Sequence, residues 1–166
     1  MNMAVKIIDR IFAFLGAVIF MQVPQFIQDY VHVLYGHLAE LTWQLDQMRT
    51  MAAKSGKTIA ELSAKFLKNA DSDIVFQGEL IDKLIKREDA FASALQALTE
   101  AGPFTKSFLF LRHSNSEIVK ETWKHFKLGL PLTLEAIFWG LIGLFLGYLL
   151  FTLLKKLLRS LSSLFS

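Results

Sequence analysis

The chain has 166 residues, enough for one domain of ordinary size. Hydrophobic residues make up 53% of it, and the net charge of +3 comes from the two ends, where basic residues flank apolar segments. Basic residues placed in this way are typical of membrane orientation signals, whereas a nucleic-acid-binding protein needs a basic patch on a folded face. Because the chain contains no Cys, a disulfide framework, thiol catalysis and a Cys-ligated zinc site are excluded.

The first predicted element is a transmembrane anchor at residues 1–27. Its apolar run, residues 11–23, is too short to cross a bilayer alone. It becomes long enough if the helix continues past Pro24 to Ile27, and a proline is tolerated inside a membrane helix. The rival interpretation is a cleaved signal peptide, but no small-residue cleavage site follows the apolar run. We therefore expect a retained anchor.

Residues 28–130 are predicted to form a helical domain outside the membrane. Apolar residues recur every three or four positions from Phe26 to Ala52, which predicts a long amphipathic helix that ends near Gly56. Further start and stop signals predict shorter helices behind it. These signals are a capping box at 58–61, caps at 71–73, a stop at 101–103, and a second capping box at 114–117 before a helix over 118–128.

A second transmembrane helix is predicted at residues 131–154. From Leu134 to Leu154 the only strongly polar residue is Glu135. A helix over that stretch measures about 31 Å, which is the thickness of the hydrocarbon core of a bilayer.

The last predicted segment, residues 155–166, is an amphipathic tail. Its leucines and Phe165 fall on one side, and its basic residues fall on the other. Such a tail is expected to lie on the cytoplasmic leaflet, where anionic lipids attract the basic side. The lipid-facing basic residues are Lys155, Lys156 and Arg159.

The predicted fold class is therefore all-α, with two transmembrane helices flanking a helical extramembrane bundle and an amphipathic C-terminal tail. Both short flanks are basic, so the positive-inside rule predicts that both termini are cytoplasmic. The central domain is then expected in the periplasm, if the host is a Gram-negative bacterium. Membrane lipids are the first expected partners.

Glu135 is the only acidic residue within the second predicted span. Thr133 is a good N-cap for that helix, and Glu135 then lies in the first turn, where the positive end of the helix stabilises an anion. An acid inside a membrane also suggests a site for protons or cations. We favour the cap.

Tyr30, His37 and Glu40 lie in the long helix and are candidates for a polar cluster, which Glu135 could complete. His37 and Glu40 are three residues apart and share one helix face. A zinc site needs three or four ligands, so this pair predicts no metal centre. The alternatives for His37 are a packing residue, which we favour, and a contact to a partner or to lipid.

Small residues on membrane helices let two backbones approach closely. The candidates for helix association are Ala136, Gly140, Gly143 and Gly147 in the second span and Ala13 and Ala17, with Gly16 beside them, in the first. The two sets can meet within one chain, or at least one set can join separate chains. We interpret the glycines as lying on more than one side of the helix, which favours both uses and hence a homo-oligomer.

Four short motifs follow one another along almost the whole chain. They are Gln22-x-Pro24-x-Phe26-x-x-x-Tyr30, Gly36-His37-x-x-Glu40, Glu121-Thr-Trp123, and Gly129-Leu-Pro-Leu-Thr-x-Glu135-Ala136 with Gly140 and Gly143. In this order they resemble a family of small proteobacterial membrane proteins that is catalogued only as a domain of unknown function. The resemblance implies a bacterial inner-membrane protein and assigns no activity.

No catalytic constellation, cofactor motif or nucleic-acid patch is recognisable in the sequence. The favoured hypothesis is therefore a non-enzymatic inner-membrane protein, either a homo-oligomeric scaffold or a small subunit of a larger complex with another membrane protein. An alternative is an oligomeric channel or mechanosensitive pore with Glu135 near its outer mouth. A weaker alternative is a membrane-anchored enzyme that uses His37 and Glu40.

Overall fold

The computed structural model describes the backbone of residues 3–129 and 133–164, and the side chains of residues 7–129 and 133–157. The described backbone forms helices connected by short loops, and it contains no strand. The predicted all-α class is confirmed. In chain order the helices are α1 (Met3–Lys54), α2 (Ile59–Leu67), α3 (Ser72–Glu100), α4 (Pro103–His113), α5 (Ser116–His125) and α6 (Leu134–Leu164).

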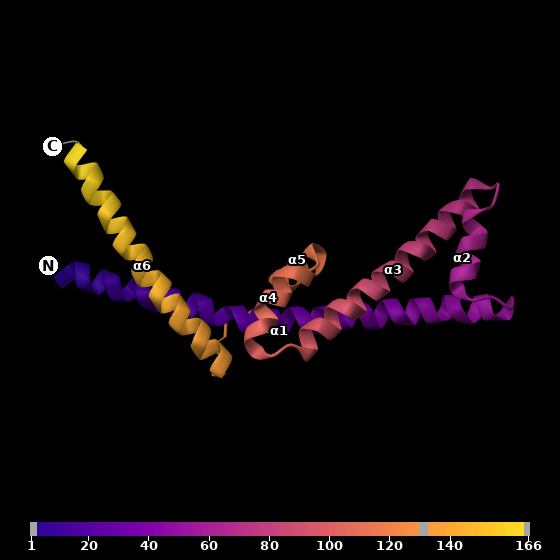
Figure 1. Ribbon diagram of the computed structural model, residues 1–166, viewed down its shortest axis with the longest axis horizontal. Coiled ribbons are helices and arrows are strands. Elements are labelled where there is room, and N and C mark those ends of the chain that lie inside the picture. The colour runs from indigo at the N-terminus through magenta and orange to yellow at the C-terminus, as the bar shows by residue number, and fades with distance from the viewer. Residues whose placement is uncertain (1–2, 130–132, 165–166) are drawn as a thin grey trace.

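Helix α1 is the long axis of the molecule (Figure 1). Its 52 residues make a rod of about 78 Å. Pro24 lies inside the helix, which continues past it without a break. The predicted boundary between an anchor ending at residue 27 and a separate body therefore falls within one continuous helix.

The body is built on the second half of α1. Its core residues on α1 are spaced by four, seven and four positions, as expected of an amphipathic helix. Helices α3 and α5 pack on that side of α1, while α2 connects its far end to α3 (Figure 1). The core consists of Tyr30, Leu34, Leu41 and Leu45 of α1, Phe91, Ala94 and Leu98 of α3, and Ile118 of α5.

The capping signals are partly confirmed. Thr58 and Glu61 form the predicted box, in which the backbone amide of Thr58 donates to the carboxylate of Glu61 at 2.8 Å. The second box is wrong. Asn115 is the N-cap of α5, and its side-chain oxygen accepts from the backbone amide of Glu117 at 2.9 Å, whereas Ser114 ends α4. Asn is at least as good an N-cap as Ser, and with Asn115 as the cap the helix begins at Ser116, two residues before the predicted residue 118; it ends at His125, before the predicted Leu128.

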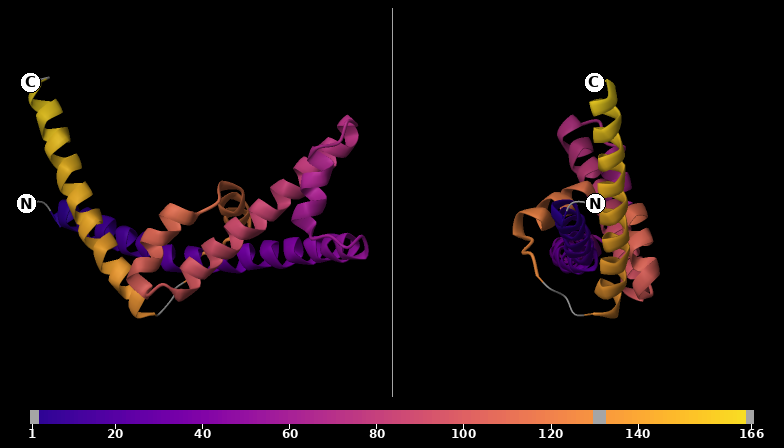
Figure 2. Two further views of the ribbon diagram at one scale, coloured as in Figure 1. Left: turned by 45° about the vertical axis from the view of Figure 1, so that its right-hand side comes forward. Right: turned by 90° about the vertical axis from the view of Figure 1, so that its left-hand side faces the viewer.

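Helix α6 crosses the first half of α1 and runs in the opposite direction, so that both termini lie at the same end of the molecule (Figure 2). By length and composition, Ile7–Lys54 and Leu134–Leu157 are long and apolar enough to cross a membrane. Helix α6 continues through the predicted tail to Leu164. The side chain of Arg159 and residues 165–166 lie outside the described residues, so the amphipathic character of the tail stays a prediction.

Candidate functional site

The contact between α1 and α6 consists largely of backbone against backbone. Ala136, Gly140, Gly143 and Gly147 are all buried, whereas the positions between them are wholly or partly exposed. A Cβ atom added to Gly143 would collide with the carbonyl oxygen of Gly16, and one added to Gly147 would collide with that of Phe12. The four small residues therefore form one stripe that faces α1.

This arrangement corrects the interpretation that the glycines lie on more than one side of the helix. Successive spacings of four, three and four residues return to the same face of a 3.6-residue helix. On α1 the residue in closest contact with the stripe is Gly16, and Ala13 lies beside it, with its Cα atom 3.1 Å from the position of a Cβ on Gly147. Ala17 is more distant, its carbonyl oxygen 3.8 Å from a Cβ on Gly140. The stripe is thus covered within one chain.

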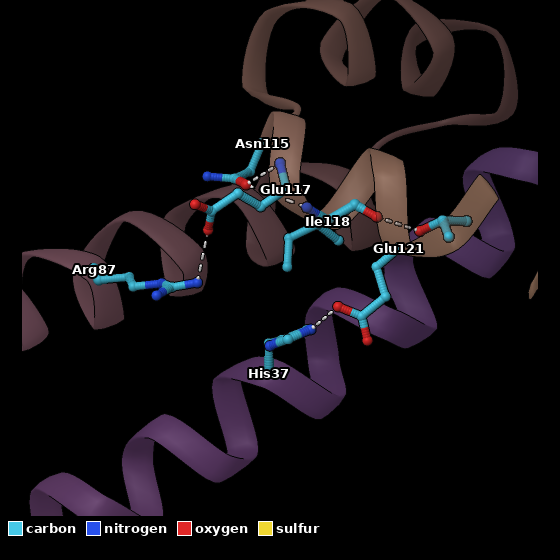
Figure 3. Close-up of polar contacts among 7 residues, drawn as sticks. His37, Arg87, Asn115, Glu117, Ile118 and Glu121 are labelled. Atoms are coloured by element: carbon cyan, nitrogen blue, oxygen red, sulfur yellow. Dashed lines mark hydrogen bonds and ion pairs between the residues drawn. The ribbon is translucent and has the colours of Figure 1, made fainter. Parts of the chain in front are cut away.

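Three of the four residues of the predicted polar cluster have different hydrogen-bond partners. Tyr30 is fully buried, and its hydroxyl oxygen accepts from the backbone amide of Asn115 at 2.9 Å. The Nε2 atom of His37 lies 2.7 Å from Oε2 of Glu121 (Figure 3). Glu40 instead accepts from the side chain of Gln44 on its own helix. These four residues are not drawn together into one site.

The hydrogen-bond partners of Tyr30 and His37, which the sequence did not predict, hold α5 in place. Asn115 and Glu121 belong to the loop before α5 and to α5 itself, while Tyr30 and His37 lie on α1. A third contact comes from α3, where Arg87 donates to Glu117 at 3.1 Å (Figure 3). The polar groups therefore act as a clamp on α5, which we call the α5 clamp: Tyr30–Asn115, His37–Glu121 and Arg87–Glu117. Among the described residues, no three His, Asp or Glu side chains are grouped so as to hold a metal ion.

Thr133 caps α6 as predicted. Its hydroxyl accepts from the backbone amide of Ala136 at 3.1 Å, which places Glu135 in the first helical turn. One carboxylate oxygen of Glu135 is buried without a hydrogen-bond partner. The positive charge of Lys106 on α4 attracts this carboxylate. The geometry agrees with the capping role and leaves the proton- or cation-binding hypothesis as a prediction.

A cavity of about 620 Å³ lies where the two crossing helices meet the body. Its walls come from α1, α4 and α6 and from α5 with the segment that follows it, so no single stretch of sequence predicts it. Beside it the side-chain amide of Gln22 bonds the backbone of Gly129 in both directions: Nε2 donates to the carbonyl oxygen at 2.8 Å, and Oε1 accepts from the amide at 3.1 Å. This double contact holds Gly129, in the segment that leads to α6, against α1.

The side of α1 that points away from the body core is also distinctive. Tyr35 and Trp43 are 64% and 60% exposed, and Ala39 lies between them on the same side because the three are four residues apart. A Cβ atom added to the neighbouring Gly36 would meet nothing within 4 Å. We call Tyr35, Gly36, Ala39 and Trp43 the outer face of α1. It presents two large aromatic rings above a flat, uncovered backbone.

Residues 5–163 match the model of a family described as DUF2937, protein of unknown function. The chain belongs to the DUF2937 family. The match covers nearly the whole sequence and confirms the expected membership of an uncharacterised family; the expected proteobacterial origin stays a prediction. No curated protein and no solved structure matches the chain.

Proposed function

We propose that this protein is a non-enzymatic subunit of a larger membrane complex, in which two spans anchor a helical body that docks another membrane protein through the outer face of α1. The observation that carries the proposal is the exposure of Tyr35 and Trp43 on the helix that also forms the first span. Aromatic side chains are enriched at protein interfaces, where a few of them carry most of the binding energy.

The contact between α1 and α6 supports a subunit over a homo-oligomeric scaffold. Self-association in lipid relies on small residues that let helices approach, and here those residues already face each other within one chain. The sides of α6 that remain exposed carry large apolar residues such as Leu141, Phe145 and Leu149, which resemble lipid tails and give little drive for association. A protein partner would therefore bind to the body and not to the two spans.

The proposed location is the bacterial inner membrane, with both termini cytoplasmic and the body periplasmic. The support is the basic character of both flanks, together with the position of both termini at one end of the molecule. Alkaline phosphatase fused after Ser55 is expected to be active, and the same enzyme fused after Ser166 is expected to be inactive. The reverse pattern would contradict this topology.

Crosslinking from the outer face tests the docking proposal. A photo-crosslinking amino acid in place of Trp43 is expected to capture one specific protein in native membranes. The same amino acid in place of Phe76, which is 66% exposed on α3, is the matched control and should capture none. A product of twice the mass of the chain would instead favour the homo-oligomeric scaffold. Absence of any specific product at position 43 would contradict the proposal.

The channel hypothesis receives no specific support from the described residues. A conducting path needs polar groups along it, yet the outward sides of α6 between Ile137 and Leu154 are dominated by Leu, Ile and Phe. Ion flux through the reconstituted protein under voltage or tension would revive it. Hydrolytic activity that His37→Ala abolishes would likewise revive the enzyme hypothesis.

A further inference from the structure

We infer that the cavity between the spans and the body is a binding site for one acyl chain of a membrane phospholipid. The inference rests on the membrane placement in the proposed function, and it is independent of the partner that the outer face of α1 would bind. Five observations carry it: the size and lining of the cavity, its unpaired donors, its depth relative to the spans, its apolar opening, and the charge beside it.

The cavity has the size and lining of a site for a small apolar ligand. Its volume of about 620 Å³ falls within the range of roughly 300–1,000 Å³ that is usual for ligand pockets. Its walls include the rings of Phe26, Phe110, Trp123 and Phe126. Phe26 packs edge-on against Phe110 and Phe126, with ring centroids 6.1 and 5.3 Å apart. A rigid aromatic wall of this kind keeps the cavity from collapsing when it is empty.

Two hydrogen-bond donors in this apolar lining lack a partner. The hydroxyl of Ser107 is buried, with the residue 7% exposed, and it makes no hydrogen bond. The Nε1 atom of Trp139 is likewise buried and unpaired. Buried polar groups in proteins are nearly always hydrogen-bonded, so each of these donors calls for an acceptor; the unpaired carboxylate oxygen of Glu135, one turn before Trp139, is one candidate, and an oxygen of a bound ligand is another. The oxygens of an acyl ester are such acceptors, and they are attached to an apolar chain.

The cavity lies at the depth where a lipid ester would be found. Val18 and Ile19 belong to the apolar run of the first span, and Trp139 lies in the second turn of the second span. Trp123 and Leu128 belong to the body side of the same cavity. The site therefore extends from the spans to the body, as the boundary between hydrocarbon and headgroups does.

The cavity is also open, and its opening is apolar. Ile19, Leu111, Trp123 and Leu128 line it while being more than half exposed. A water-soluble ligand would find no polar entrance there, whereas a lipid tail can enter sideways from the bilayer. This continuity with the bilayer favours a lipid over a dissolved small molecule.

Three lysines are next to lining residues of the body in the sequence. Lys106 precedes Ser107 on α4, and Lys124 and Lys127 adjoin Trp123 and Phe126 in the sequence. The phosphate of a bound phospholipid would lie on this side, where positive charge favours an anionic headgroup. The proposed occupant is therefore an acyl chain of an anionic glycerophospholipid such as phosphatidylglycerol.

Photolabelling of the full chain in vesicles tests the inference. The probe is phosphatidylglycerol with a diazirine on one acyl chain, mixed into phosphatidylcholine vesicles, and the labelled peptides are mapped by mass spectrometry. A chain bound in the cavity labels α4 around Phe110 and the segment around Phe126. Lipid that merely surrounds the spans labels the outward sides of α1 and α6. Label confined to those outward sides would overturn the inference.

Two variants sharpen the test. Val23→Trp fills the cavity and is expected to lower labelling of α4 about tenfold, which corresponds to roughly 1.4 kcal/mol of binding. Its matched control is Leu144→Trp, which places the same ring on the lipid side of α6 and should leave that label unchanged. Ser107→Ala keeps the volume, removes one donor, and is expected to lower the label roughly three- to tenfold.

The remaining outcomes separate this inference from the proposed function. Trp43→Ala is expected to keep full labelling of α4, so loss of a protein partner and loss of lipid are distinguishable. Unchanged labelling in both Val23→Trp and Ser107→Ala would overturn the lipid site. So would a photo-crosslinker in place of Leu111 that captures a protein in native membranes, because a partner helix would then occupy the cavity.

Discussion

Helix α1 makes two kinds of contact along its length. In its first half it meets α6 through Gly16 and Gly143, two residues without side chains, where the two backbones touch. In its second half it meets α5 through Tyr30 and His37, which reach polar partners far away in the sequence. The first contact depends on shape, whereas the second depends on directed polar groups. The two halves should therefore respond differently to mutation and to salt.

The largest effect is expected at the glycine stripe. Gly143→Leu would push α6 away from the carbonyl oxygen of Gly16 and is expected to destabilise the chain in detergent by about 1–3 kcal/mol, as overpacking does in a core. Denaturant or thermal unfolding followed by circular dichroism measures the loss. The control is Leu146→Ile, a swap of equal volume at a partly exposed position of the same helix, which should be tolerated. A changed oligomer size with unchanged stability would show that the stripe joins separate chains.

The next effect concerns the buried hydroxyl of the α5 clamp. Tyr30→Phe leaves the backbone amide of Asn115 without its acceptor and is expected to cost about 1 kcal/mol of unfolding free energy. Tyr35→Phe removes the same atom from a ring that is 64% exposed, so it should change the stability little. Equal stabilities of the two variants would mean that water replaces the lost acceptor and that this contact does not position α5.

A smaller effect is expected for the contact between His37 and Glu121 in the α5 clamp, which is an ion pair only when the imidazole is protonated. His37 and Glu121 are 36% and 45% exposed, so water screens their attraction. A double-mutant cycle with His37→Gln and Glu121→Gln should give a coupling of roughly 0.2–1 kcal/mol. The coupling should weaken as salt is added, whereas the effect of Gly143→Leu should not. A coupling that is insensitive to salt would contradict the electrostatic account.

The smallest effect is expected at the cap of α2. The backbone amide of Thr58 donates to the carboxylate of Glu61 and holds the pKa of that side chain below its ordinary value. A lowered pKa in the folded state means that the ionised cap adds stability above the ordinary value of 4.5 and loses it as the pH falls through the lowered pKa. Glu61→Gln should remove this pH dependence, as followed by unfolding titrations from neutral to acid pH. An unchanged pH dependence would assign it to other carboxylates.

Sequence periodicity was sufficient for the features that are local. The Thr58 and Asp71 caps and the capping of α6 by Thr133 all depend on residues within one or two turns of helix, and the two long apolar helices are visible as continuous apolar runs. The one cap that was misplaced shows the limit of such patterns. Ser114 and Asn115 are adjacent candidates, and the box pattern favoured the serine, although asparagine is the N-cap.

The α5 clamp and the cavity could not be predicted in this way. The residues of the pairs Tyr30–Asn115 and His37–Glu121 are 85 and 84 positions apart, so their meeting depends on how the loops return α5 to α1. The cavity needs walls from four helices and therefore has no signature in any one of them. The spacing of the glycine stripe already indicates a single helix face, and the interpretation that the glycines lie on more than one side was wrong.

The uninterrupted path of α1 through Pro24 has a mechanical consequence. Membrane helices change their tilt when the thickness of the bilayer changes. The part of α1 beyond residue 27 is about 40 Å long, so a tilt of roughly 10° in the span would carry its far end sideways by about 7 Å. Helix α2 and the adjoining end of α3, which pack at that end, would move with it. If the first part of α1 spans the membrane as proposed, the position of the body would follow the angle of that span.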